Sequence, residues 1–117
     1  MTSRTSTRLK VLFVCSRNRW RSPTAEALFK GSQTIDARSA GTSPQARVRI
    51  NEKHLRWADR IFVMEPHHRR QIQERLGHQF AGKRIVVLDI PDEYQFMDEA
   101  LISVLRERLR PHLEMTD

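Results

Sequence analysis

The stretch of sequence that decides the fold is VLFVCSRNRWRSPTAEALF, from Val11 to Phe29. It lies within a longer apolar run, LKVLFVC, which begins at Leu9 and ends at Cys15. A short apolar run rich in β-branched and aromatic residues is typical of a strand that is buried on both faces. The sequence therefore predicts a central strand over residues 9–15.

A polar segment and a helix follow this strand at once. The segment SRNRWRSP has the composition of a loop. Ser22 and Pro23 are suited to the N-cap and the first helical position, and Gly31 is placed to end the helix TAEALFK. This order brings the end of the strand next to the start of the helix.

The rest of the chain repeats this alternation of strands and helices. We expect further strands at residues 34–39, 60–64 and 84–88, and helices at residues 51–57, 66–76 and 99–110. Such an alternation predicts an α/β fold, a parallel sheet with helices on both faces. Ligands of these sheets bind at the carboxyl ends of the strands. Two segments with reactive side chains leave strands at that edge, residues 15–22 and 89–94.

The length of 117 residues allows one domain, and 38% hydrophobic with 30% charged residues argues against a disordered chain. We expect residues 1–8 to form a flexible N-terminal tail and residues 9–117 to form the domain. No apolar run approaches the roughly 20 residues that cross a bilayer, and residues 11–14 are too few for the core of a signal peptide. We therefore expect a cytoplasmic protein without a membrane partner.

The net charge of +7 is unevenly distributed along the chain. Residues 1–57 hold 12 Lys or Arg against 3 Asp or Glu, whereas residues 58–117 hold 9 against 11. The basic half should attract an anion: a phosphate ester, a nucleic acid or an acidic protein. Charge alone does not choose among these partners.

The loop after the first strand carries the chemistry. Its amides and the first N–H groups of the helix can converge on one tetrahedral oxyanion and stabilise a thiolate at Cys15. Arg21 can fork onto two phosphate oxygens, and Ser22 can donate to the thiolate. Because Cys15 is the only cysteine, an internal disulfide and a multi-cysteine zinc site are excluded. The alternative is that Cys15 is an inert thiol at the end of a strand.

The stretch from Val11 to Phe29 resembles the phosphate loop of the low-molecular-weight protein tyrosine phosphatases, whose pattern is Val-Cys-x-Gly-Asn-x-Cys-Arg-Ser-Pro followed by a helix with Ala-Glu. Three further motifs match in order, ARSAGT at residues 37–42, ADRIFVME at residues 58–65 and DIPDEY at residues 89–94. Four motifs in the correct order are far more specific than one. The resemblance implies a three-layer sandwich around a four-stranded parallel sheet of order 2-1-3-4.

The resemblance also implies roles for individual residues. Cys15 is expected to be the nucleophile, Arg21 the phosphate clamp and Asp92 the general acid, without metal or cofactor. Asn18 is expected to hold the loop in shape through a hydrogen bond with Ser39. The remaining residues expected around the phosphate are Ser16, Arg17, Arg19, Trp20 and Ser22.

The chain departs from the family pattern at three positions. Arg17 replaces the glycine of the loop, which predicts a strained or reshaped turn. Trp20 replaces the second cysteine, so that a disulfide with Cys15 cannot form. Glu93 replaces the proline after the acid. The segment from residue 43 to residue 58 is also short, and we expect it to lack the aromatic residues that flank a phosphotyrosine ring.

Several other residues could serve the fold rather than the chemistry. Asp92 competes for the role of acid with Asp89, Glu93, Asp98 and Glu99, of which Asp98 is better suited to cap a helix. Tyr94 is suited equally to the rim of a pocket and to a half-buried position. We expect Trp57 and Met64 in the core. His67 and His68, being adjacent on a helix, are expected to point apart and to lie on the surface.

These observations favour a phosphomonoester hydrolase that works through a cysteinyl-phosphate, with a phosphorylated protein, phosphotyrosine above all, or a small phosphomonoester as substrate. Arsenate reduction would require further cysteines to relay a disulfide. The alternative of another class is a phosphate-sensing or nucleic-acid-binding module with the same loop and little turnover.

Overall fold

The computed structural model describes residues 8–77 and 84–115. Residues 1–7 of the predicted tail lie outside this part of the chain. The elements in order are β1 (Leu9–Cys15), α1 (Arg21–Leu28), β2 (Ile35–Gly41), α2 (Glu52–Trp57), β3 (Arg60–Val63), α3 (Pro66–Leu76), β4 (Arg84–Val87) and α4 (Glu99–Leu109). The predicted alternation of strands and helices is confirmed.

The four strands form one parallel sheet in the order β2-β1-β3-β4. Strand β1 lies between two partners, so that Phe13 is opposite Ser39 of β2 on one side and Phe62 of β3 on the other. The predicted order 2-1-3-4 is therefore confirmed. This arrangement also explains the apolar run of β1, because a central strand covered on both faces has no solvent-facing side.

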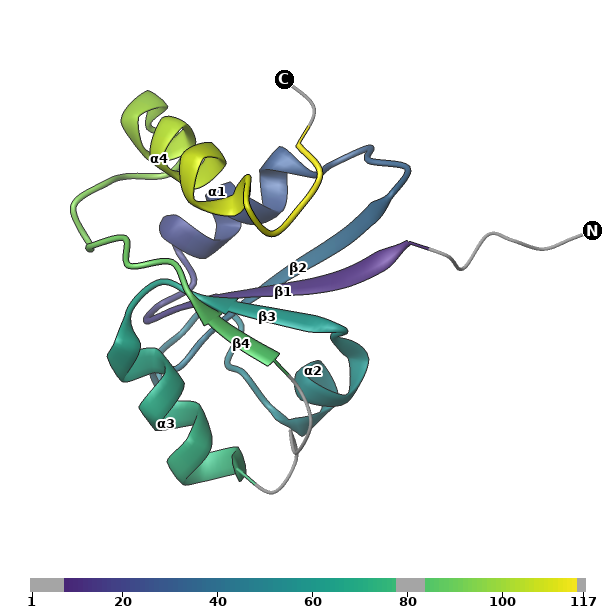
Figure 1. Ribbon diagram of the computed structural model, residues 1–117. Coiled ribbons are helices and arrows are strands. Elements are labelled where there is room, and N and C mark those ends of the chain that lie inside the picture. The colour runs from purple at the N-terminus through teal and green to yellow at the C-terminus, as the bar shows by residue number, and fades with distance from the viewer. Residues whose placement is uncertain (1–7, 78–83, 116–117) are drawn as a thin grey trace, which may run out of the picture.

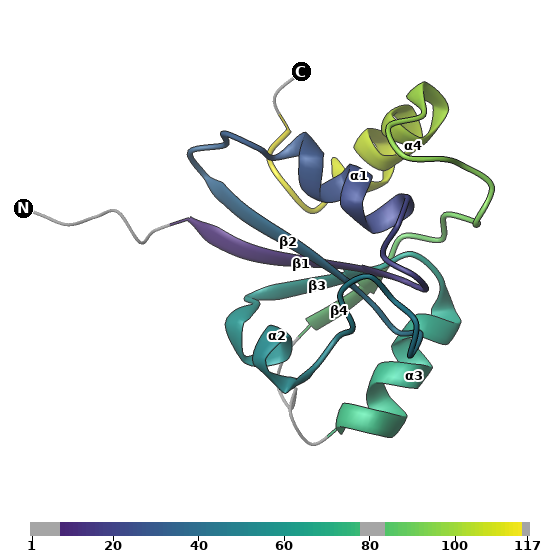
Figure 2. The same cartoon turned by 180° about the vertical axis from the view of Figure 1, so that it is seen from behind.

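Helices cover both faces of the sheet, α1 and α4 on one and α2 and α3 on the other (Figures 1 and 2). Side chains of β1 alternate between the two cores: Val11, Phe13 and Cys15 face α1 and α4, while Leu12 and Val14 face α2 and α3. The first core is centred on three stacked rings. The ring centroid of Phe13 in β1 lies 5.8 Å from that of Phe29, just after α1, and 5.7 Å from that of Phe62 in β3. The alternation places the Cys15 side chain on the α1 face of the sheet.

The start of α1 differs from the prediction. The helix begins at Arg21, so that Pro23 occupies its third position, and no side chain caps it. A proline fits there because the first N–H groups of a helix have no intrahelical partner. The hydroxyl of Ser22 is not a cap because it contacts Cys15 and Asn18 instead.

The other helix boundaries follow the sequence signals. Gly31 has a φ of +81° just beyond the end of α1, a conformation that glycine adopts without strain. The side chain of Asp98 accepts a hydrogen bond from the Ala100 N–H and caps α4, as predicted. Within residues 8–77 and 84–115, no helix combines the length and apolar character that a membrane span requires.

Candidate active site

The loop between β1 and α1 is held by the segment that follows β2. The carbonyls of Cys15, Ser16 and Arg17 accept hydrogen bonds of 3.0, 2.9 and 3.0 Å from main-chain N–H groups of residues 42, 43 and 47. The carbonyl of Asn18 accepts from Nε of Arg47 at 3.1 Å. In a trans peptide the C=O and the next N–H point in opposite directions. The four N–H groups of residues 16–19 therefore point toward the inside of the loop, where they form a site for an oxyanion.

Gly41 allows this close approach. A Cβ atom at this position would lie 2.5 Å from the carbonyl oxygen of Ser16 and 2.7 Å from Cβ of Ala46. The glycine of the ARSAGT motif is thus required by the contact between the end of β2 and the phosphate loop. The sequence predicted a strand only as far as residue 39 and gave Gly41, the last residue of β2, no role.

A chain of buried polar side chains lies behind the loop. Nδ2 of Asn18 donates to Oγ of Ser22 and to Oγ of Ser39, both at 2.9 Å, and Ser39 donates to the carboxylate of Glu26. The predicted contact between Asn18 and Ser39 is present. The expected strain at Arg17 is absent, because the positive φ of the loop, 57°, falls on Asn18, a residue type that tolerates this conformation.

Cys15 is 3% exposed, and its Sγ lies 3.0 Å from Oγ of Ser22. Oγ of Ser22 accepts a hydrogen bond from Asn18 and lies 3.4 Å from the carbonyl oxygen of Ala40. When Cys15 is ionised its sulfur only accepts, so the hydroxyl is then the donor to the sulfur. A hydroxyl that donates to sulfur stabilises the thiolate, the nucleophilic form of the side chain.

Arg21 is 2% exposed and is held from two sides. Its Nη1 donates to Oε1 of Glu65 at 2.6 Å and to the carbonyl of Ile90 at 2.9 Å, and its Nε lies 3.7 Å from Oδ1 of Asp92. Among the described residues none bonds Nη2 of Arg21. The fixed guanidinium therefore retains donors for a bound oxyanion.

A pocket of about 310 Å³ brings the predicted site residues together. It is lined by Cys15, Arg17, Arg19, Trp20, Arg21 and Asp92. The side chains of Asn18, Ser22 and Ser39 are buried behind it. Asp92 lines the same pocket and is 57% exposed, so its carboxylate is open to solvent.

The expectation that His68 lies on the surface is wrong. His68 is completely buried, with Nδ1 accepting from the Glu65 N–H at 3.0 Å and Nε2 lying 2.9 Å from Oγ of Ser16. Because Nδ1 is an acceptor, Nε2 carries the proton and donates to Ser16. Burial, together with the positive charges of His67 and Arg21, lowers the pKa of His68 to about 3. The ring is therefore neutral at physiological pH and positions the first residue of the loop.

Glu65, His67 and His68 also form a group whose potential ligand atoms lie within 4.8 Å of one another. Both ring nitrogens of His68 and Oε1 of Glu65 are already engaged in hydrogen bonds, so binding of a metal ion would break the contacts that position Ser16 and Arg21. This group thus supports the loop. Sequence reasoning missed Glu65 and His68, although Glu65 directly follows a buried strand at the ligand-binding edge of the sheet.

Comparison with known proteins agrees with this geometry. Residues 10–80 match the model of the family "low molecular weight phosphotyrosine protein phosphatase". No curated protein matches the sequence significantly. The similar solved structures include three phosphatases. The arginine phosphatase YwlE from Geobacillus stearothermophilus is 20% identical with a TM-score of 0.66, and the match covers 92% of this chain and 99% of that chain.

The tyrosine phosphatase Wzb from Escherichia coli K30, in complex with phosphate, is 24% identical with a TM-score of 0.66 and coverages of 86% and 91%. SP-PTP from Streptococcus pyogenes, a low molecular weight protein tyrosine phosphatase, is 20% identical with a TM-score of 0.71 and coverages of 91% and 94%. At these identities the likeness shows the shared fold.

The fold, together with a thiol inside an oxyanion-binding loop, defines the class of cysteine-dependent phosphatases. The chain belongs to the low molecular weight phosphotyrosine protein phosphatase family, whose members need no metal ion.

The role of Gly41 is tested by the substitution Gly41→Ala. The added methyl group should push the loop away from the end of β2, and because displacement of catalytic groups by about 1 Å can cost 10²-fold in rate, activity on an aryl phosphate should fall by about that factor. Gly77→Ala is the control, since its Cβ would meet no atom within 4 Å. Equal activity of the two variants would contradict the argument.

The buried His68 should make folding stability depend on pH. In the unfolded chain its pKa is about 6.5, so stability is fully present above that pH and falls as the pH drops toward about 3. Between pH 7.5 and pH 5.0 the loss from this group is about 2 kcal/mol. In urea unfolding, His68→Asn should reduce the pH dependence by about that amount, and His67→Asn should largely retain it. An unchanged dependence in His68→Asn would refute the assignment.

Proposed function

We propose that this protein hydrolyses phosphomonoesters, phosphotyrosine in proteins above all, through a phosphate covalently bound to Cys15. The observation that carries the proposal is the position of the Cys15 sulfur, which lines a pocket together with Arg21 and Asp92 in a loop whose N–H groups point inward. A tetrahedral dianion that enters this loop meets hydrogen-bond donors on several sides. Its phosphorus atom then faces the nucleophile.

In the first step the Cys15 thiolate attacks phosphorus, and the bond to the leaving oxygen breaks. Asp92, protonated at this stage, transfers its proton to the leaving oxygen. Negative charge on the three equatorial oxygens is stabilised by the loop N–H groups and by Nη2 of Arg21. The hydrogen bond from Ser22 favours the thiolate both as the attacking group and later as the leaving group.

In the second step a water molecule attacks the cysteinyl-phosphate. The Asp92 carboxylate takes a proton from this water, the sulfur–phosphorus bond breaks, and inorganic phosphate and the Cys15 thiolate are released. Neutral His68 donates to Ser16 without placing a further positive charge beside Arg21. The side chains thus complete the cycle with protons and charges balanced.

Support for an aromatic substrate comes from the surroundings of the pocket. Trp20 is 43% exposed on its wall and Phe96 is 53% exposed in the neighbouring loop. These rings can take the place of the aromatic residues that the segment 43–58 was expected to lack. Family members act on phosphorylated proteins or small phosphoesters, and we extend this to phosphotyrosine here. The free thiol that this chemistry needs is best maintained in the reducing cytoplasm.

The proposal is tested by the hydrolysis of p-nitrophenyl phosphate by wild type and Cys15→Ser. Wild type should be active in the presence of a chelator, and the variant should be reduced to background because it lacks the thiolate. Phosphotyrosine and phosphoarginine peptides compared in the same assay identify the preferred bond. Phosphate binding by wild type without any hydrolysis would instead indicate a phosphate-sensing module.

Asp92→Asn tests the general acid. The need for a proton grows with the pKa of the leaving group, so the variant should slow the hydrolysis of phenyl phosphate by about 10²–10⁴-fold and that of p-nitrophenyl phosphate less. Glu93→Gln removes an adjacent charge and should be mild on both esters. If Glu93→Gln were the damaging substitution, the acid would be Glu93 rather than Asp92.

A further inference from the structure

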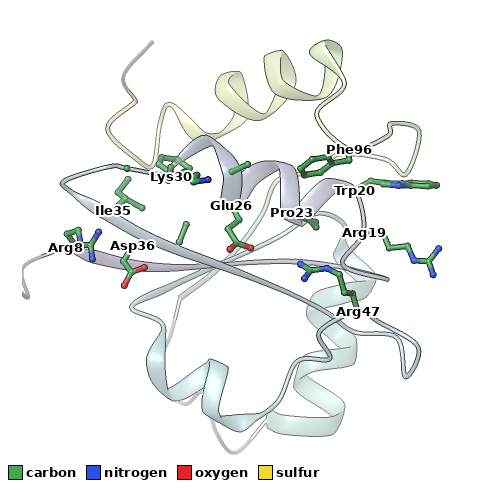
Figure 3. A pocket seen from close by; sticks show the side chains of 14 residues that line it. Arg8, Arg19, Trp20, Pro23, Glu26, Lys30, Ile35, Asp36, Arg47 and Phe96 are labelled. Carbon is green, nitrogen blue, oxygen red and sulfur yellow. The ribbon is translucent and has the colours of Figure 1, made fainter.

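A second and larger hollow lies beside the catalytic pocket. This groove, of about 800 Å³, runs along α1 and strand β2, from Arg8 and Asp36 at one end to Trp20 and Phe96 at the other (Figure 3). Arg19 and Trp20 line both the groove and the catalytic pocket. A chain that enters the pocket with one side chain can therefore continue into the groove.

The floor of the groove includes an open edge of the sheet. Strand β2 is the edge strand, and its residues 36, 38 and 40 direct their main-chain groups toward β1. The main-chain N–H and C=O groups that point away from β1 are those of Ile35, Ala37 and Ser39. At one end of the strand, the outward N–H of Ile35 donates to Oγ of Ser32. At the other end, the N–H of Gly41 donates to the carbonyl of residue 48, and the carbonyl of Gly41 accepts from the N–H of residue 50. Within residues 8–77 and 84–115, no group bonds the main chain of Ala37 on this side, whereas Ser39 is buried and does not line the groove.

An edge of this kind accepts an extended peptide as an additional strand. The peptide would be held by main-chain hydrogen bonds to Ala37, which lines the groove. Alternate side chains of the peptide would point toward α1 and toward solvent. The edge thus gives affinity without demanding a particular sequence.

The charges of the groove select an acidic peptide. Four cationic side chains line it, those of Arg8, Arg19, Lys30 and Arg47, against the two carboxylates of Glu26 and Asp36. One of these carboxylates, that of Glu26, accepts a hydrogen bond from Ser39, which disperses part of its charge. Lys30 is exposed on the wall formed by α1.

We propose that this groove binds an acidic segment of the phosphoprotein substrate, extended along the edge of β2, while the phosphorylated side chain of the same segment occupies the Cys15 pocket. The inference rests on the proposed function, because it assigns the groove to the substrate of that site. It adds a recognition surface that a small phosphoester does not reach.

The experiment compares two phosphotyrosine peptides, one with glutamates on both sides of the phosphotyrosine and one with glutamines in their place. Wild type should hydrolyse the glutamate peptide with a kcat/KM about three- to ten-fold higher, and the preference should fall as salt is added. Lys30→Glu should abolish the preference and leave p-nitrophenyl phosphate hydrolysis unchanged. Lys53→Glu, with the same charge change on α2 at the other face of the sheet, should retain it.

The strand geometry is tested with the substrate rather than with the protein. Glutamate peptides methylated at one main-chain nitrogen at a time should show an alternating loss of kcat/KM, because only every second N–H faces the edge of β2. Methylation that is tolerated equally at all positions would overturn the added strand.

The outcomes separate this inference from the function on which it rests. Absence of p-nitrophenyl phosphate hydrolysis by wild type would refute the proposed function. Hydrolysis of that ester with equal rates on the two peptides, or with equal effects of Lys30→Glu and Lys53→Glu, would overturn the groove alone. Stronger inhibition by a single-stranded oligonucleotide than by the unphosphorylated glutamate peptide would assign the groove to nucleic acid and would also overturn it.

Discussion

Four successive carbonyls of the phosphate loop, those of residues 15–18, are bonded to the segment of residues 42–47, and the rest of the site depends on this contact. A short polar loop has many conformations, and most of them do not turn consecutive N–H groups to one side. Bonding every carbonyl on the outside fixes the peptide planes, and the oxyanion site on the inside follows. The order of the sheet is part of the same constraint, because only a β2 adjacent to β1 delivers residues 42–47 to the loop. Gly41 is the residue that allows this approach.

The site is costly to the stability of a small domain. Asn18, Arg21, Ser22 and His68 are buried or nearly so, and burial of polar groups is favourable only when their hydrogen bonds are made. Removing Glu65 would leave the buried Arg21 guanidinium with only the exposed Asp92 carboxylate, 3.7 Å from Nε, as a counter-charge, whereas the intact pair adds little net stability. The pair is therefore better explained by the orientation of Arg21 than by the free energy of folding. Burial also explains why His68 is neutral. A protonated ring would lose its hydration and would be repelled by the positive charge of Arg21.

Sequence reasoning succeeded where one local pattern determines the outcome. The apolar run of β1 predicted a central strand, and the polar segment after Cys15 predicted the loop between β1 and α1; the order of the sheet came from the resemblance. It failed where a side chain serves a distant segment. Ser22 is a residue type that favours the N-cap position, but its hydroxyl contacts Asn18 and the Cys15 sulfur instead. His68 lies 52 residues from its partner Ser16. The expectation that His67 and His68 point apart is also wrong, because their ring centroids lie 4.1 Å from each other.

The departures from the family pattern can be understood from the same geometry. A glycine is not needed at residue 17, because the left-handed turn of the loop is made by Asn18 and the carbonyl of Arg17 is held by residue 47. The side chain of Arg17 is then free to line the pocket. Trp20, which stands where the family has a second cysteine, lines both the pocket of Cys15 and the groove along β2. Residues that would disturb a tighter loop thus place cationic and aromatic groups in the lining of the pocket.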